Sequence, residues 1–70
     1  MVREWNVEEG WGVIDSEHTP GGAWASFSEV DDVGFRSLTR GSQVSFEPKV
    51  AEQDGFHFRA LQIRQLMPPR

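Results

Sequence analysis

Residues 9–14 (Glu-Gly-Trp-Gly-Val-Ile) constrain the fold more than any other part of the chain. Trp11 and Val13 point to one face and the residues between and after them to the other, which is the period of a β-strand. Glycine weakens a strand, so a glycine inside one marks a place where another group approaches closely. Residues 23–27 (Ala-Trp-Ala-Ser-Phe) also set a large ring between small residues. The sequence therefore predicts two neighbouring strands whose tryptophans form a platform for planar ligands.

Composition limits the size of the fold and the kinds of partner. The 70 residues are enough for one small domain, which buries only about 60% of its unfolded surface. Cysteine is absent, which excludes disulfides and thiolate metal sites. The formal net charge of −4 argues against a protein that binds duplexes by neutralising many phosphates. Binding to single strands stays open, because stacking contributes about 1–3 kcal/mol per base without any charge.

The first half of the chain contains two further candidate strands. Residues 2–6 alternate, and we expect Arg3 and Trp5 to share a face. Residues 15–22 contain a proline and two glycines, which indicate a loop. Residues 23–27 then form the third strand. A polar connection ending in glycine joins the first strand to the Trp11 strand as a hairpin.

The second half begins with a long connection and ends with a hairpin. Residues 31–41 lack sustained alternation and are expected to form the connection. Residues 43–47 alternate as the fourth strand, which Pro48 closes unless this proline lies at a sheet edge. Residues 51–55 are expected to form a hairpin turn, for which Asp54 and Gly55 are the strong signal.

The last strand changes phase in its middle. It runs from residue 56 to about residue 66, with Phe58 and Ala60 on one face, followed by Leu61 and Ile63 on the opposite phase. A straight strand would invert its faces at this slip, so we expect a bulge or sharp bend at residues 60–61.

No segment has the period of a helix, and short strands with turns between them are typical of an all-β domain. Five strands with one long middle connection predict a five-stranded antiparallel barrel of the OB type. We expect residues 1–66 to form this domain and residues 67–70 to form a flexible tail.

Three blocks of the chain resemble the bacterial cold-shock proteins, in the same order and with similar spacing. Residues 2–14 (VREWNVEEGWGVI) resemble the family's opening V-K-W-F-N-x-E-K-G-F-G-F-I. Residues 23–28 (AWASFS) are similar to V-F-V-H-F-S, and residues 34–47 (GFRSLTRGSQVSFE) to G-F-[KR]-[ST]-L-x-x-G-x-x-V-S-F-E. The resemblance implies a five-stranded OB barrel (a cold-shock domain) that binds single-stranded DNA or RNA.

The chain departs from the family pattern at positions that the resemblance assigns to binding. Three positions lose a ring and three gain a larger one: Glu4, Val13 and Ser26 in the first group, Trp5, Trp11 and Trp24 in the second. Glu9 replaces a lysine that would face phosphate. Each lost ring that would have stacked a base removes about 1–3 kcal/mol of binding free energy.

The candidate nucleic-acid-binding residues combine aromatic, cationic and small polar side chains: Arg3, Trp5, Trp11, Val13, Trp24, Ser26, Phe27, Phe35 and Arg36. The alternative for Trp11 and Trp24 is burial in the core of a small barrel. Trp5 is as compatible with core packing as with the platform, and Phe27 with a position between core and surface. Phe35 lies in a polar loop, which it could also pin to the barrel.

Other chemistry has little support in the sequence. His18 and His57 have no partner at a metal-ligand spacing, so we expect no metal site and no cofactor. No Ser-His-Asp arrangement or phosphate-binding loop is present, so we expect no catalytic residues and no enzyme. No apolar run is long enough to span a membrane, and no signal segment opens the chain. We expect a soluble, cytoplasmic protein, monomeric by default.

The sequence thus leaves two functions to be tested. The first is binding of single-stranded RNA or DNA by base stacking, with an RNA-chaperone or expression-regulating role implied by the resemblance. The alternative is an OB-fold interaction module, in which an apolar face rimmed by Glu4 and Glu9 binds a basic protein partner.

Overall fold

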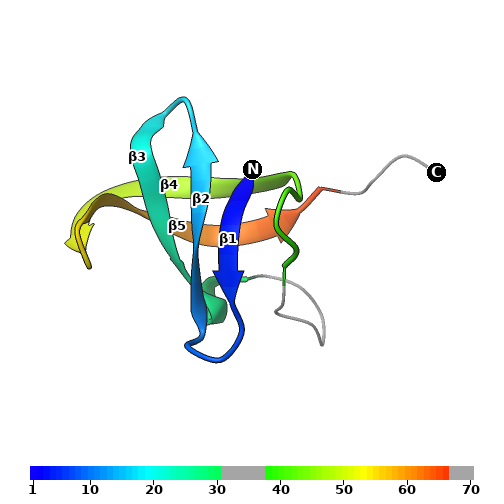
Figure 1. Cartoon of the computed structure of the whole chain (residues 1–70). Coiled ribbons are helices and arrows are strands. Elements are labelled where there is room, and N and C mark those ends of the chain that lie inside the picture. Colours follow the sequence, from blue (N-terminus) through cyan, green and yellow to red (C-terminus); the bar gives the residue numbers. More distant parts are fainter. Residues whose placement is uncertain (31–37, 67–70) are drawn as a thin grey trace.

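The structure is a computed structural model that describes residues 1–30 and 38–66. Its elements are β1 (Val2–Asn6), β2 (Trp11–Ser16), β3 (Thr19–Ser26), the short 3₁₀ helix η1 (Phe27–Glu29), β4 (Val44–Gln53) and β5 (Phe56–Gln65) (Figure 1). The prediction of an all-β fold with a five-stranded sheet is confirmed. Phe35, Arg36 and the predicted tail at residues 67–70 lie outside the described residues.

The sheet is mixed rather than wholly antiparallel. Its strand order is β1-β2-β3-β5-β4, and every pair is antiparallel except β3 and β5, which run parallel. Parallel neighbours need a long crossover connection, and here residues 27–55 provide it through η1, the middle connection and β4. The hairpin of β4 and β5 therefore docks on the rest of the sheet through its second strand.

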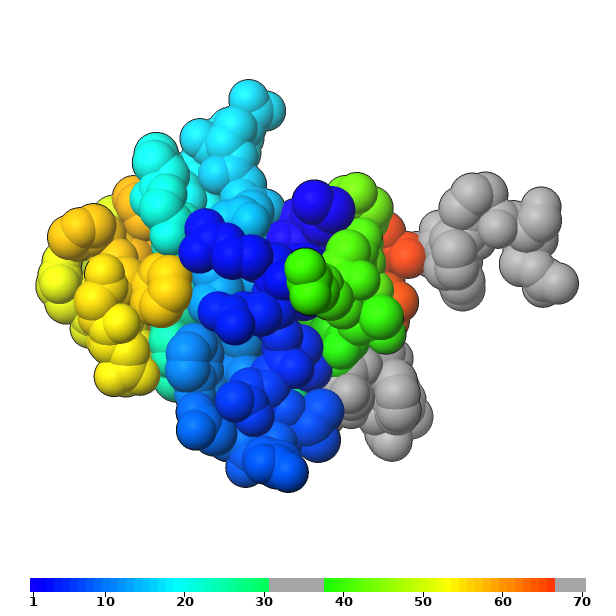
Figure 2. Space-filling view, in the orientation of Figure 1, coloured from blue at the N-terminus to red at the C-terminus, as the bar shows by residue number. Residues whose placement is uncertain are grey.

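The free edge of β1 meets the segment that precedes β4. The amide of Val2 donates to the carbonyl of Ser42 (2.9 Å), and the amide of Gly41 donates to the carbonyl of Val2 (2.8 Å). Figure 2 shows residues 38–43 (green) lying against β1 (blue). Among the described residues these hydrogen bonds do not continue as a ladder between β1 and β4, so no strand pairing closes the sheet.

The core consists of small and branched side chains on one face of the curved sheet. The buried cluster contains Val2, Ile14, Ala23, Ala25, Val30, Leu38, Ala60 and Ile63, and Trp5, Val44, Phe46 and Phe58 pack against it. Alanine lies opposite alanine where β3 pairs with β5, at Ala25 and Ala60. Small side chains at this centre leave room for the larger rings that come from the outer strands.

A bulge in β1 separates two residues that the sequence predicted on one face. Val2 pairs with Ile14 and Glu4 pairs with Val13, so Arg3 is an extra residue on β1. As a result Arg3 is exposed, while Trp5 returns to the core side of the sheet. The expectation that Arg3 and Trp5 share a face is wrong because simple alternation does not count a bulge.

The hairpin between β2 and β3 is tighter than the predicted loop at residues 15–22. Ser16 pairs with Thr19, so the turn itself has only two residues, and Thr19 is buried. Two extra residues of β3 are accommodated in a bulge in which Gly21 and Gly22 have φ of +89° and +99°. The glycines that indicated a loop instead allow the strand to continue, because glycine adopts positive φ without strain.

The predicted slip in the last strand is confirmed as a bulge, centred one to two residues further along the chain. Ala60 and Ile63 both face the core, and Gln62 between them has φ of +49°. The carboxylate of Glu29 accepts a hydrogen bond from the backbone amide of Gln62 (3.1 Å). The bulge leaves this amide without a partner in the β4–β5 ladder, so Glu29 satisfies it. The element η1 is thereby attached to β5.

The hairpin of β4 and β5 agrees with its turn signal. Asp54 and Gly55 have φ of +50° and +87° and form a two-residue turn, which is shorter than the predicted residues 51–55 because β4 continues to Gln53. Pro48 does not end β4, which continues to Gln53; it lies in a strand at the edge of the sheet. This is the second of the two positions that the sequence allowed for Pro48.

Gly12 is required because the Trp5 ring lies directly on it. A Cβ atom at Gly12 would be 2.2 Å from Cε3 of Trp5 and 2.5 Å from the carbonyl oxygen of Glu4. We predict that Gly12→Ala lowers the free energy of unfolding by about 2–3 kcal/mol and changes the near-UV circular dichroism of the tryptophans. Gly55→Ala is the matched control: it adds the same methyl group in open space, so it costs about 1 kcal/mol through its positive φ and leaves the tryptophan signal unchanged. Equal stability of Gly12→Ala and the wild type in urea unfolding would contradict this packing.

Candidate nucleic-acid interface

The strand register places one row of side chains across the outer face of the whole sheet. Residues that pair across neighbouring strands point to the same face. The row runs from β1 to β4 through Glu4, Val13, Trp24, Arg59 and Lys49. It lies on the face opposite the core, because the chain neighbours of Trp24 and the next residue after Arg59 are the buried alanines of the core.

Trp11 and Trp24 form a stacked pair on this outer face. We call the surface formed by these two side chains the outer stripe. Their ring centroids are 6.1 Å apart and the ring planes differ by 22°. The Arg59 guanidinium carbon lies 5.2 Å from the centroid of the Trp24 ring, in a cation–π contact. Trp24 on β3 therefore lies between Trp11 on β2 and Arg59 on β5. Both tryptophans are half-buried, so the outer stripe keeps exposed aromatic surface.

Arg59 is the residue of this arrangement that sequence reasoning missed. A lone arginine in an alternating strand is most often a solvated charge, and only the parallel pairing of β3 with β5 brings it to Trp24. One signal was available: Arg59 stands between the apolar Phe58 and Ala60, which predicts that it faces away from the core.

Val13 forms part of the floor beside the outer stripe. It is 0% exposed, and a Cβ atom at Gly22 would lie 2.8 Å from its Cγ1 and 2.9 Å from the Arg3 guanidinium. The bulge glycine therefore leaves room for the guanidinium to lie close to Val13. In this arrangement Val13 has no surface to offer to a base.

Trp5 and Phe27 form a second aromatic pair, on the core side of the sheet. Their rings stack with centroids 4.7 Å apart and planes 9° apart. Trp5 packs against the core over Gly12, and the Phe27 amide donates to the carbonyl of Gly10 (3.0 Å). The four predicted rings within the described residues thus form two pairs on two faces rather than one platform. The contacts of Trp5 match the core-packing alternative.

Ser26 lies opposite Trp11 but its hydroxyl is already engaged. Its Oγ accepts a hydrogen bond from the Ser28 amide (3.2 Å) and lies 2.9 Å from the Ser28 Oγ. Ser26 therefore caps η1, a role that serine fills well because its oxygen satisfies a free amide at the start of a helix. The serine fixes the direction in which the chain leaves β3.

Arg3 is paired with a carboxylate of the neighbouring strand. Its Nε donates to both carboxylate oxygens of Asp15 (3.0 and 3.1 Å), and its Nη2 donates to Asp15 and to the carbonyl of Gly21 (3.3 Å). These hydrogen bonds raise the pKa of the Arg3 guanidinium and lower the pKa of the Asp15 carboxyl below its usual value. The charge of Arg3 is thus largely balanced within the protein.

Acidic side chains lie at the β1–β2 end of the outer stripe. The Trp11 indole Nε1 donates to the Glu9 carboxylate (2.9 Å), and the Glu9 amide donates to the Asn6 side chain (3.0 Å). Glu4 occupies the β1 end of the row. Carboxylates therefore flank the β1–β2 end of the outer stripe. Arg59 and Lys49 lie at the other end, where, among the described residues, Glu47 on the same face of β4 forms no ion pair with either of them.

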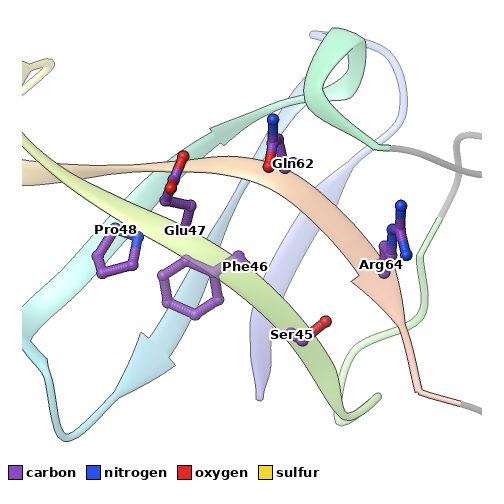
Figure 3. Close-up of a pocket in the computed structure, with 6 residues that line it drawn as sticks. All are labelled: Ser45, Phe46, Glu47, Pro48, Gln62 and Arg64. Carbon is purple, nitrogen blue, oxygen red and sulfur yellow. The ribbon is translucent and has the colours of Figure 1, made fainter.

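A groove of about 430 Å³ lies at the bulge between β4 and β5 (Figure 3). Its lining combines polar and apolar side chains, namely Ser45, Phe46, Glu47, Pro48, Gln62 and Arg64.

Over residues 1–30 and 38–66, no three His, Asp or Glu side chains gather closely enough to hold a metal ion.

No protein-family model matches the chain, and no curated protein is significantly similar to it. None of the helices in the described part of the chain is long and apolar enough to cross a membrane.

The Arg3–Asp15 pair predicts a small, pH-dependent contribution to stability. Because the pKa of Asp15 is lowered in the folded state, the contribution is present at neutral pH and is lost as the pH falls through the folded pKa. The two side chains are 43% and 41% exposed, so we expect less than about 1 kcal/mol. Urea unfolding of the wild type and Asp15→Asn should differ at pH 7, and the difference should shrink in acid. In an Arg3→Gln background the pH-dependent part should shrink to the smaller contribution of the N-terminal ammonium group; an unchanged pH dependence would contradict the pairing.

Proposed function

We propose that this protein binds single-stranded RNA or DNA by stacking bases on the outer stripe. The observation that carries the proposal is the stacked pair of Trp11 and Trp24 on the face opposite the core, with an arginine over the second ring. Aromatic side chains stack any base through its π-face, and each stacked base contributes about 1–3 kcal/mol. Two stacked bases contribute about 2–6 kcal/mol, and a micromolar dissociation constant corresponds to about 8 kcal/mol, so cation contacts supply the remainder in this proposal.

The proposed fold assignment is an OB barrel of the cold-shock type. In support, the sheet has five strands in the order β1-β2-β3-β5-β4, and Val2 joins the β1 edge to residues just before β4 through two hydrogen bonds. The three sequence blocks that resemble the cold-shock proteins fall on β1–β2, on β3 with η1, and on the segment that leads into β4. An RNA-chaperone or expression-regulating role in the cytoplasm follows from that resemblance and is part of the proposal.

In this proposal the candidate residues have different roles. Trp11 and Trp24 take the bases, because their pair lies on the outer face. Trp5 packs against the core, Phe27 stacks on Trp5, and the fully buried Val13 forms part of the floor. Ser26 orients the chain at the end of β3.

The test of the proposal is quenching of the intrinsic tryptophan emission by a short oligothymidylate at low salt. We expect saturable quenching for the wild type and a loss of affinity of about tenfold or more for Trp11→Ala or Trp24→Ala. Phe56→Ala is a control outside the outer stripe and should bind like the wild type if it remains folded. Because few cations are available, the salt dependence should be shallow. Unchanged emission at high micromolar oligonucleotide would contradict the proposal.

A second candidate function is an interaction module for a basic protein segment. The observation that favours it is the Glu9 carboxylate held at the Trp11 indole, with Glu4 at the same end of the outer stripe. An aromatic patch beside carboxylates attracts a cationic side chain through both the ring faces and the charge.

Competition separates the two functions. A lysine- and arginine-rich peptide should bind more weakly than the oligothymidylate if the first function is right, and the oligonucleotide should displace it. If the peptide binds, Trp11→Ala abolishes that binding, and no oligonucleotide binds, the interaction module is the better assignment. Isothermal titration of both ligands to the same protein gives the comparison.

A further inference from the structure

We propose that the phosphate backbone of the bound nucleic acid contacts the protein on the β5–β4 side of the outer stripe, at Arg59 and Lys49. This inference rests on the proposed function and adds the position of the phosphate and the direction in which the strand crosses the sheet. Four observations carry it: the register of β4 and β5, the state of the Arg59 side chain, the pairing of Arg3, and the positions of the carboxylates.

Arg59 and Lys49 are direct partners across the β4–β5 ladder. Like charges that face each other on one side of a sheet destabilise it, so a fold without a ligand gains nothing from this pair. Within residues 1–30 and 38–66, neither cation forms an ion pair with a carboxylate. Two adjacent, unbalanced cations on one face form a suitable site for an anion such as a phosphodiester.

Arg59 is also held in a position suited to a ligand beside Trp24. Its guanidinium carbon lies 5.2 Å from the Trp24 ring centroid, so the cation is kept next to the ring on which a base would stack. Its Nε is buried and has no hydrogen-bond partner among the described residues. Guanidinium groups bind phosphate through two parallel hydrogen bonds, and the stacked position leaves the terminal nitrogens for such a contact.

The opposite end of the outer stripe is unsuited to phosphate. Glu9 is hydrogen-bonded to Trp11, and Glu4 lies at the β1 end of the row, so a phosphate there would meet negative charge. Arg3 is near this end, but its Nε and Nη2 donate to Asp15, and its Nη2 also donates to the carbonyl of Gly21. Arg3, the cation that the sequence predicted for phosphate binding, is therefore paired with Asp15. Arg59 and Lys49, which the strand register brings together, form no ion pair among the described residues.

The direction of the nucleic acid follows from this distribution of charge. Bases that stack on Trp11 and Trp24 are joined to a backbone that continues over β5 towards the β4 edge, rather than over β1. The site is short, because among the described residues this path consists of the rings of Trp11 and Trp24 and the cations Arg59 and Lys49. A short site with few cations fits an interface that binds loosely and without strong sequence preference.

Charge removal at single positions tests the inference. We measure the affinity of a short oligothymidylate by tryptophan quenching from about 50 to about 200 mM salt for the wild type, Lys49→Gln, Arg59→Gln and the double variant. Each phosphate contact on a single strand adds about 0.7 to the slope of log affinity against log salt, so each single variant should lose about 0.7 and the double variant about 1.4. Affinity at about 50 mM salt should fall about fivefold to tenfold for each cation.

Three further variants serve as controls. Arg40→Gln removes the same charge from the exposed turn before β4, and Arg3→Gln removes it from the β1 side; neither should change the slope. Arg59→Lys keeps the charge without the planar guanidinium and should retain the slope. Lys49 lies exposed on the edge strand, so Lys49→Gln folds without repacking, which circular dichroism verifies.

The outcomes separate this inference from the proposed function. Wild-type quenching with an unchanged slope in the Lys49→Gln and Arg59→Gln double variant overturns the inference and leaves the proposed function in place. A slope that falls equally in Arg40→Gln, or falls only in Arg3→Gln, also overturns it. If no oligonucleotide quenches the wild type at any salt concentration, the proposed function fails and the inference fails with it.

Discussion

The parallel pairing of β3 with β5 is the contact on which both the core and the outer face depend. On the core side it sets Ala25 opposite Ala60, and these small side chains let the rings of the outer strands approach the centre. On the other side the same register places Arg59 beside Trp24. Because successive residues of a strand alternate between faces, one register decides both arrangements at once. A shift of β5 by one residue would turn Arg59 towards the core and Ala60 towards the outer face.

Bulges decide which side chains reach which face. The extra residue in β1 turns Arg3 outward and returns Trp5 to the core, and the bulge at Gln62 keeps both Ala60 and Ile63 inward. The two glycines of β3 allow a third irregularity beside the floor residue Val13. Small curved sheets use bulges in this way, because a flat sheet cannot wrap a core. The candidate interface is a consequence of this curvature as much as of the residues that compose it.

Along the row that crosses the outer face, Glu4 lies at the β1 end and Arg59 and Lys49 lie at the β5–β4 end. At the acidic end Glu9 accepts a hydrogen bond from Trp11, and at the cationic end Arg59 makes a cation–π contact with Trp24. Net charge alone, at −4, gave no indication of this separation. An overall acidic protein can still offer a local cationic surface, since charge interactions across a small surface are screened over about 8–10 Å.

Local patterns in the sequence determined most of the elements of this protein. The alternation of residues 2–6 and 9–14, the Asp54–Gly55 turn and the phase slip in the last strand predicted strands, a hairpin and a bulge that the structure contains. These features depend on the backbone preferences and side-chain period of neighbouring residues, so sequence alone carries them. The two faces of the Trp11 strand were predicted by the same period.

Only the tertiary structure decided how those elements combine. It showed that β3 and β5 are parallel, that Trp5 and Phe27 stack on the core side, and that Arg3 is paired while Arg59 lies on Trp24. Each of these depends on residues far apart in the chain or on a bulge that shifts the alternation, and no local pattern records either. The sequence by itself thus determined that aromatic strands form a sheet, and the long-range pairing of the strands decided which rings and charges share the outer face.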